Sequence, residues 1–524
     1  MIKDLFEKID YFWFFLLLTV FVCFGYFFTN PTIGIDDELI VFFTSTEIIL
    51  QVGRLGKFLT NIIFQPQIIP MVYDVLGISF FVISIILICD IFKKYLSGFT
   101  KKEMTIFSTL AISFPFAAFV FIFIHNCIDL GLCFLSAALA SSFFIKYFYE
   151  DKKKIYLLYT FLLLIFSISM YETGLFYFIL IPAFVIIYSL IFDKHFKFTN
   201  RELYTQVGTS ILLLVSVIFI YHIILKIVMY TCGMDYNKID DYMKYNFSSI
   251  NTFITSVSDS FCEFGRILYM NINNHLCCKL IIISCITLLL LSLYYTIRKK
   301  NLLIMLLAIL MTLIPVSYFL ATGFPHMQYR IFFAYGIMNA MAFVLIYKLF
   351  SQKPYIEKIL LFLCFTLVFA QAKEMNAMFF TEHLKYENDK LFAYSIDNDL
   401  KRLNLEYYPI VFVGVRESIQ PTYSFNGLAN EINASIYNWD RCDTKEGELT
   451  TQRPYQFMQQ IGYAIYPFFE LKDKKTEKII QYQKEIENAI SEMQVYPKEN
   501  SIKKLNDFVL IRIGKSRFDK NYIR

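Results

Sequence analysis

The chain has 524 residues, of which 57% are hydrophobic, 19% are aromatic and only 18% are charged. Because about 25% of residues are charged in a soluble protein, this composition excludes a soluble globular protein and predicts an integral membrane protein with many spans. The net charge of +5 identifies no partner by itself, since the informative property of a membrane protein is the side on which its basic residues lie.

Eleven apolar runs in the sequence are close to the length that crosses a bilayer, which is usually about 17 to 25 residues. They predict transmembrane helices near residues 11–29, 71–91, 104–124, 128–149, 155–170, 174–192, 204–230, 277–297, 301–320, 331–349 and 356–372. A further uncharged stretch, 59–73, is interrupted by Pro66 and Pro70, so it predicts a helix that lies in the membrane interface.

Basic residues determine the predicted orientation, because they concentrate in short cytoplasmic loops. Six segments on one side are basic, and the opposite short loops carry almost no Lys or Arg. The basic segments contain Lys3, Lys8, Lys93, Lys94, Lys101, Lys102, Lys152, Lys153, Lys154, Lys194, Lys197, Arg201, Arg298, Lys299, Lys300, Lys348, Lys353 and Lys358. The N-terminus is therefore predicted to be cytoplasmic, with loops 30–70 and 231–276 and the C-terminal region outside.

From about Lys373 the composition changes to that of a soluble domain. Residues 409–415 and 508–513 predict buried strands, 474–493 predicts an amphipathic helix, and 420–457 predicts irregular structure. We therefore predict a transmembrane domain over 1–372 and a soluble extracytoplasmic domain over 373–524. The expected fold class is an all-α polytopic membrane protein with about 11 transmembrane helices and a small α/β domain at its C-terminal end.

Three adjacent acids, Asp36, Asp37 and Glu38, follow the first predicted span, after a stretch from Tyr11 to Ile35 that carries no charge. Neighbouring carboxylates repel one another, so at least one of them should hold a proton more readily, which suits proton abstraction. The alternative is a hydrophilic stop that only fixes the end of a helix.

Basic residues in two outside segments are candidates for binding a phosphate. Arg54 and Lys57 are three residues apart, share a face on a helix, and follow glycines that permit close approach. His326 and Arg330 are four residues apart in the loop between the ninth and tenth predicted spans. The alternatives are that Arg54 and Lys57 only contact lipid headgroups and that Arg330 only anchors its loop.

Polar groups also mark the two other short outside loops, at His125-Asn126 and Tyr171-Glu172, where a structural cap is the simpler interpretation. The few charges near spans, including Asp74 and Asp129, lie within about a turn of a predicted span end. Ion-coupled transporters place charges at mid-membrane, so this pattern argues against that class. It favours an enzyme with a lipid-linked donor whose phosphate lies at the outside face.

The segment Ile35-Asp36-Asp37-Glu38, followed by Gly53-Arg54, resembles the bacterial serotype-converting O-antigen glucosyltransferases, which are membrane glycosyltransferases of the GT-C type. This motif lies in the first 70 residues, and the remaining similarity is one of topology. The resemblance implies a GT-C-like fold, a polyprenyl-phosphate sugar donor, usually glucose, and a lipid-linked or surface glycan acceptor. It also implies that an acid of the first outside loop is catalytic.

The resulting hypothesis is a glycosyltransferase of a bacterial inner membrane, in which Asp37, assisted by Asp36 and Glu38, deprotonates an acceptor hydroxyl. Arg54, Lys57, Arg330 and His326 would contact the donor phosphate. A lipid phosphate leaves as a stable anion, so no metal or other cofactor is implied, although a divalent ion remains open. No phosphate-binding glycine loop occurs, and no nucleic acid is expected as a partner. The alternatives are a lipid-linked saccharide flippase or transporter, a glycan polymerase, and a non-catalytic scaffold.

Overall fold

The computed structural model describes residues 10–34, 37, 49–50, 53–64, 70–193, 198–234, 250–322, 332–416, 435–438, 449–450, 452–463, 470–471 and 477–516. Over this part of the chain the fold is mostly helical, with a small sheet near the C-terminal end. The chain forms two compact units. The helical unit comprises Met1–Thr29, Ser45–Ala377 and Phe425–Ala429, and the C-terminal unit comprises Asn30–Thr44, Met378–Ser424 and Asn430–Arg524.

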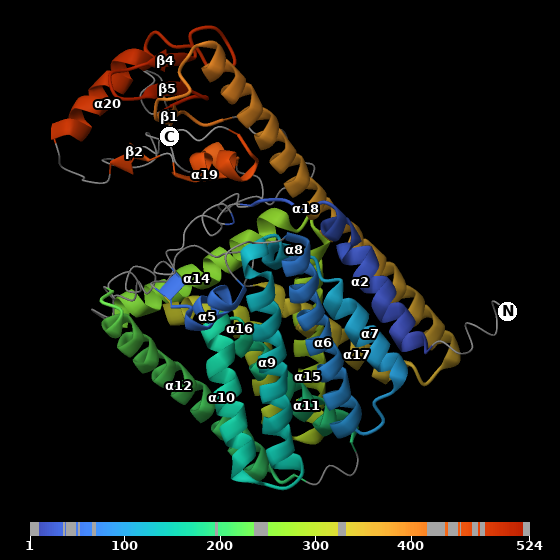
Figure 1. Cartoon of the computed structure of the whole chain (residues 1–524). Helices are drawn as coiled ribbons and strands as arrows, with labels where there is room; N and C mark the ends of the chain where they lie inside the picture. Colours follow the sequence, from blue (N-terminus) through green and yellow to red (C-terminus); the bar gives the residue numbers. More distant parts are fainter. Residues whose placement is uncertain are drawn as a thin grey trace. The chain divides into compact units, whose positions relative to one another are not determined.

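Most helices of the helical unit run side by side (Figure 1). The last of them, α18, continues into the C-terminal unit. The helices are α2 (Tyr11–Thr29), α5 (Leu55–Phe64), α6 (Pro70–Tyr95), α7 (Lys101–Ile112), α8 (Phe116–Phe121), α9 (Ile124–Tyr149), α10 (Lys154–Met170), α11 (Gly174–Phe192), α12 (Asn200–Thr231), α14 (Ile250–Asn271), α15 (Leu276–Lys299), α16 (Leu302–Thr322), α17 (Ala334–Phe350) and α18 (Pro354–Arg402).

Seven helices in the described part of the chain are long and apolar enough to cross a membrane, namely α2, α6, α9, α11, α12, α15 and α18. Shorter apolar helices are found in α10, α16 and α17. The prediction of a mostly helical protein with several helices that are long and apolar enough to cross a membrane is therefore confirmed. The count of eleven spans stays a prediction.

The predicted span 104–124 is wrong as a single helix, because α7 ends at Ile112 and α8 begins at Phe116. Pro115 lies in the gap, and proline lacks the N–H and has a ring that clashes with the preceding turn of a helix. The predicted interface helix over 59–73 is also different. Helix α5 ends at Phe64, and Pro70 begins α6, at the first helical position where proline is well tolerated.

Two segments contain more helix than the sequence pattern predicted. The predicted loop 231–276 contains the amphipathic helix α14. The predicted span 356–372 is only the apolar part of α18, which continues to Arg402. No Gly or Pro occurs between Lys373 and Arg402, so nothing in that stretch interrupts the helix.

Helices α6 and α9 pack closely near their N-terminal ends (Figure 1). A Cβ atom on Gly77 of α6 would overlap the carbonyl oxygen of Cys127, and a Cβ atom on Gly131 of α9 would overlap the carbonyl oxygen of Gly77. Two glycines thus permit a backbone contact that no larger residue would allow. The contact aligns the first turns of both helices, and the thiol of Cys127 donates to Asp74 Oδ1 over 3.5 Å.

The C-terminal unit contains a three-stranded sheet in the order β1-β5-β4, with β1 parallel to β5 and β4 antiparallel to β5. The predicted strands 409–415 and 508–513 correspond to β1 and β5, and the predicted helix 474–493 corresponds to α20. The elements of this unit are β1 (Ile410–Val413), η2 (Ile436–Asn438), β2 (Leu449–Thr450), α19 (Gln452–Gln460), β3 (Glu470–Leu471), α20 (Glu477–Ile490), β4 (Ile502–Lys504) and β5 (Val509–Arg512). Helix α19 begins within the stretch 420–457 that was predicted to be irregular.

The sheet lies between two helices, because its strands are apolar on both faces. Ile410 and Phe412 of β1 pack in one cluster with Ala393, Ile396 and Leu400 of α18. The alternate residues of β1, Val411 and Val413, pack in a second cluster with Tyr482, Ile486 and Ile490 of α20. Side chains of a strand point alternately to opposite faces, so α18 and α20 cover the two faces of one small sheet.

Candidate functional site

Asp37 belongs to the C-terminal unit and is 2% exposed. Its Oδ2 atom accepts a hydrogen bond of 2.9 Å from the backbone amide of Gly34. A buried carboxylate needs such partners, because burial of an unpaired charge is costly. The other two acids of the predicted triplet, Asp36 and Glu38, lie outside the described residues.

Glu382 on α18 is a second buried acid of the same unit, and sequence reasoning did not select it. Its carboxylate forms an ion pair with Lys385, and the charges of Asp37 and Asp389 act on it. Helix α18 is about 74 Å long and the hydrocarbon core of a bilayer is about 30 Å thick. Glu382 lies ten positions beyond Ala372, where the charge-free apolar run from Ile359 ends, so we expect it outside the membrane-spanning part. Burial raises the pKa of Glu382 to about 6, with Lys385 opposing the shift.

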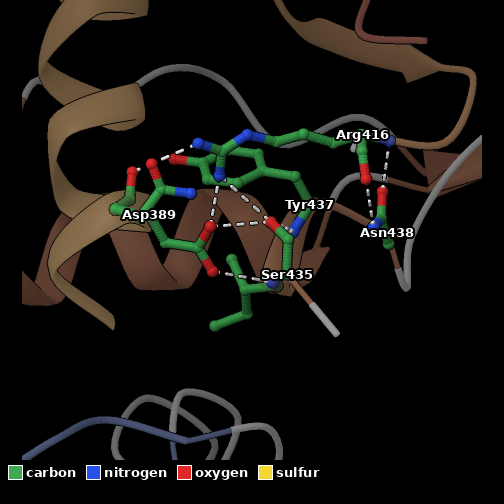
Figure 2. A network of polar contacts seen from close by, with 7 residues as sticks. Asp389, Arg416, Ser435, Tyr437 and Asn438 are labelled. Carbon is green, nitrogen blue, oxygen red and sulfur yellow. Dashed lines mark hydrogen bonds and ion pairs between the residues drawn. The ribbon is translucent and has the colours of Figure 1, made fainter. Parts of the chain in front are cut away.

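Asp389, two turns further along α18, is the centre of a polar network in the C-terminal unit (Figure 2). Its Oδ1 atom accepts hydrogen bonds from Arg416 and from the hydroxyl of Ser435, the latter over 2.7 Å, and Oδ2 accepts from the amide of Ile436 over 3.0 Å. Arg416 also stacks on the ring of Phe392, with its Cζ 3.9 Å from the ring centroid. Burial lowers the pKa of Arg416, and Asp389 opposes this effect. The network joins α18, the end of β1 and η2.

In the helical unit, two side-chain contacts connect α5 to the first turns of α9. The ammonium of Lys57 donates to Asn126 Oδ1, and the hydroxyl of Thr60 donates to Asp129 Oδ1. All four residues are buried. Lys57 and Thr60 are three residues apart on α5, and Asn126 and Asp129 are three residues apart on α9, so each helix presents its two side chains on one face. The two contacts therefore follow one another along the α5–α9 interface.

Arg54 precedes α5, and its carbonyl oxygen accepts the amide of Phe58 over 3.0 Å. Its guanidinium lies over the ring of Tyr171, with Cζ 4.3 Å from the centroid. The expectation that Arg54 and Lys57 share a helix face is therefore only half correct, because Arg54 is the capping residue rather than part of the helix.

Helix α12 holds the backbone around Arg54 through one hydroxyl. Tyr221 Oη accepts from the amide of Leu55 over 3.1 Å and donates to the carbonyl of Gly53 over 2.7 Å. Helix α5 also contacts the end of α10 closely, since a Cβ atom on Gly56 would overlap Ser169 Oγ. The start of α5 is thus fixed by two neighbouring helices.

Asp129 is the carboxylate on which the charges of both Lys57 and Arg54 act. The sequence identified the two cations but treated Asp129 only as a charge near a span end. Asn126 was interpreted as a polar group of a short loop, and it lies instead in the first turn of α9. These partners are 69 residues away from Lys57 and Thr60 along the chain, so no local pattern could connect them.

The predicted site residues that the structure describes fall into two groups, one in each unit. Asp37 lies in the C-terminal unit with Glu382, and Arg54 and Lys57 lie in the helical unit with Asn126 and Asp129. His326 and Arg330 lie outside the described residues. Within the described ranges, no group of three or more His, Cys, Asp or Glu side chains is placed to hold a metal ion. Whether the reaction needs a metal therefore stays a prediction.

The apolar helices are consistent with a multi-pass membrane protein, and the described part of the chain carries buried acidic and basic side chains. A family model described as glucosyl transferase GtrII matches residues 25–347, more than half of the chain, and the chain belongs to this family. The matched range includes Asp37, Lys57 and Asp129 and ends before α18. No curated protein and no solved structure gives a significant match. The resemblance to serotype-converting O-antigen glucosyltransferases is thereby confirmed.

Proposed function

We propose that the protein transfers glucose from a polyprenyl-phosphate donor to a lipid-linked or surface glycan of the O-antigen type, at the extracytoplasmic face of a bacterial inner membrane. Membership of the glucosyl transferase GtrII family supports the glucosyltransferase activity and the O-antigen acceptor. The basic segments are predicted to be cytoplasmic, which supports a reaction site at the opposite, extracytoplasmic face. The apolar body of the protein, with polar groups near the helix ends, supports a donor whose chain lies in lipid.

The burial of Asp37 is the observation that carries the proposed mechanism. In this mechanism Asp37 removes the proton from an acceptor hydroxyl as the oxygen attacks the anomeric carbon, and the bond from that carbon to the lipid phosphate breaks. A general base acts only from a fixed position within hydrogen-bond reach of the proton. The hydrogen bond from Gly34 to Asp37 restricts the carboxylate to one orientation, and its 2% exposure keeps bulk water from competing with the acceptor.

The same proposal assigns the charge that develops on the leaving phosphate to Arg54 and Lys57, together with Arg330 and His326 from the sequence. Positive groups aimed at a developing negative charge stabilise a transition state more than a ground state. Arg suits a phosphate through its fork of N–H groups, and Lys suits it as a point charge.

The test is glucose transfer by purified Asp37→Asn protein, measured with polyprenyl-phosphate glucose and extracted acceptor glycan. The substitution keeps the shape and removes the charge, so the rate should fall about a hundred- to ten-thousand-fold. Asp37→Glu should also be slow, because a displacement of about 1 Å costs on the order of a hundred-fold.

Asp397→Asn is the matched control, because Asp397 is another buried carboxylate of the C-terminal unit, paired with Lys401. The control should transfer glucose at close to the normal rate per folded molecule. A normal rate with Asp37→Asn would overturn the assignment of the base. No transfer by the unmodified protein would overturn the enzyme itself and favour a flippase or a scaffold.

A further inference from the structure

Asp129 is a buried charge that the proposed mechanism does not use. It is 3% exposed, and Lys57 is 2% exposed. The Asp129 carboxylate accepts from Thr60 and lies in the field of Lys57 and Arg54. Breaking a buried ion pair by removing one partner is strongly unfavourable, yet replacing the whole pair by well-packed neutral groups is often neutral. Stability alone therefore gives little reason for this pair, and its geometry is more informative.

The geometry fixes the end of a long, flexible side chain. Lys57 carries four rotatable methylene groups, and its ammonium would otherwise sample many positions. Asn126 Oδ1 accepts a hydrogen bond from the ammonium, and the negative charge of Asp129 lies one turn further along the same face of α9. Thr60, one turn after Lys57 on α5, holds the Asp129 carboxylate. In these contacts α9 holds the ammonium through Asn126, and α5 holds the Asp129 carboxylate through Thr60.

We propose that Asp129 is a positioning residue for the donor phosphate: with Asn126 and Thr60, it holds the Lys57 ammonium in the orientation in which the phosphate of a polyprenyl donor meets it. This inference rests on the proposed function, in which Lys57 contacts that phosphate. An ammonium group has three N–H donors, so the bond to Asn126 does not by itself prevent donation to a phosphate oxygen. Lys57 is already ordered before the phosphate binds, so the entropy cost of ordering this side chain does not reduce the binding affinity.

The first measurement is the KM for polyprenyl-phosphate glucose and the inhibition constant of sugar-free polyprenyl phosphate, with uncharged polyprenol as the reference compound. Asp129→Asn should raise both constants about tenfold, because it removes the counter-charge of Lys57 and leaves Thr60 with a weaker, neutral acceptor. The KM for the acceptor glycan and the inhibition by polyprenol should not change. Thr60→Val keeps the size of the side chain and removes the bond to Asp129, so it should shift the same two constants in the same direction without removing a charge.

The control variant is Glu103→Gln. Glu103 is also a fully buried carboxylate of the helical unit, it lies 3.3 Å from the ammonium of Lys348, and the sequence places it next to a cytoplasmic loop. This substitution should lower the melting temperature of the protein and leave the donor KM unchanged. A general loss of packing would raise the donor KM in both variants, and that result would overturn the proposal.

The double variant Lys57→Met/Asp129→Asn separates positioning from stability, because it removes both charges together. It should regain most of the thermal stability that either single variant loses, while the donor KM stays as high as in Lys57→Met alone. Recovery of a normal donor KM by the double variant would show that the pair is only structural.

A raised KM in Lys57→Met with a normal KM in Asp129→Asn and Thr60→Val would overturn this inference and leave the proposed function intact. A normal donor KM in Lys57→Met would remove the phosphate role of Lys57 itself, while the Asp37 test would still decide the base.

Discussion

Removal of Asp389 should destabilise the C-terminal unit far more than removal of another buried acid on the same helix. Asp389→Ala deletes the counter-charge of Arg416 and the acceptor for Ser435 and for the amide of Ile436. The Arg416 side chain is 12% exposed, so water cannot fully replace the lost carboxylate. Breaking a buried pair in this way costs about 3–5 kcal/mol, which predicts a loss of about 4 kcal/mol in the free energy of unfolding.

Asp397→Ala is the matched comparison, because Asp397 is also buried on α18. Its partner Lys401 is 54% exposed, so the ammonium is solvated when the carboxylate is removed. Pairs that reach solvent contribute about 1 kcal/mol or less. The difference between the two variants therefore measures the burial of the cation together with the lost hydrogen bonds from Ser435 and Ile436, rather than the loss of an acid alone.

The assay is urea unfolding of the full chain in detergent, followed by tryptophan emission. The protein has only two Trp residues, Trp13 and Trp439, and Trp439 follows Asn438 directly in the sequence. In a Trp13→Phe background the emission reports on the C-terminal unit alone. With a slope of about 2 kcal/mol per molar urea, Asp389→Ala should lower the midpoint by about 2 M and Asp397→Ala by about 0.5 M.

Equal midpoint shifts for the two variants would refute the reasoning from burial. The second check is Asp389→Leu/Arg416→Met, which removes both charges and should recover most of the stability lost by Asp389→Ala. If the double variant is as unstable as the single one, the packing of η2 rather than the uncompensated charge of Arg416 determines the loss.

Two further predictions concern packing and pH. Gly56→Ala should destabilise the helical unit by about 1–3 kcal/mol in a thermal melt, because its Cβ would overlap Ser169 Oγ. Gly208→Ala is the control and should be neutral, because no atom lies within 4 Å of the added Cβ. Equal effects of the two substitutions would contradict the close contact at Gly56. In the unfolded chain Glu382 has its ordinary pKa of 4.5, and in the folded protein its pKa is about 6. Glu382 is therefore protonated in both states at pH 4. As the pH rises to 7, its ionisation in the buried site lowers the free energy of unfolding. Glu382→Gln removes this loss, so the difference in unfolding free energy between the two proteins should change by about 2 kcal/mol over that range; a difference that stays constant in the Trp439 assay would contradict the raised pKa.

Elements with a strong local pattern were predictable from the sequence. The apolar run around β1 and the Ile residues of α20 are each explained by one element and its period. The break before α8 was also visible in principle, because Pro115 interrupts an otherwise apolar run. Hydropathy alone predicts one span over 104–124, since the run is apolar on both sides of Pro115.

The contacts of the candidate site were not predictable, because they join elements that are far apart in the sequence. Nothing near Lys57 indicates that its ammonium donates a hydrogen bond to Asn126. Glu382, Lys385 and Asp389 carried a usable signal, since they recur every three or four residues on α18 in line with the buried Ala393 and Ile396. Charged residues at the buried spacing of an amphipathic helix have to be paired, so this pattern marks a polar core even without a structure.

The two predicted phosphate ligands of the helical unit are not equivalent once their surroundings are known. Lys57 donates to Asn126 and lies in the field of Asp129, so its ammonium is held in one place and acts on an anion as a fixed point charge. Arg54 stacks on Tyr171 through the face of its guanidinium, and the N–H groups of a guanidinium point outward in its plane. Stacking and donation to a phosphate are therefore compatible for Arg54. On the proposed function, Arg54 would supply the bidentate contact to the donor phosphate and Lys57 a fixed point charge, so Arg54→Lys should recover less donor binding than its retained charge alone would predict.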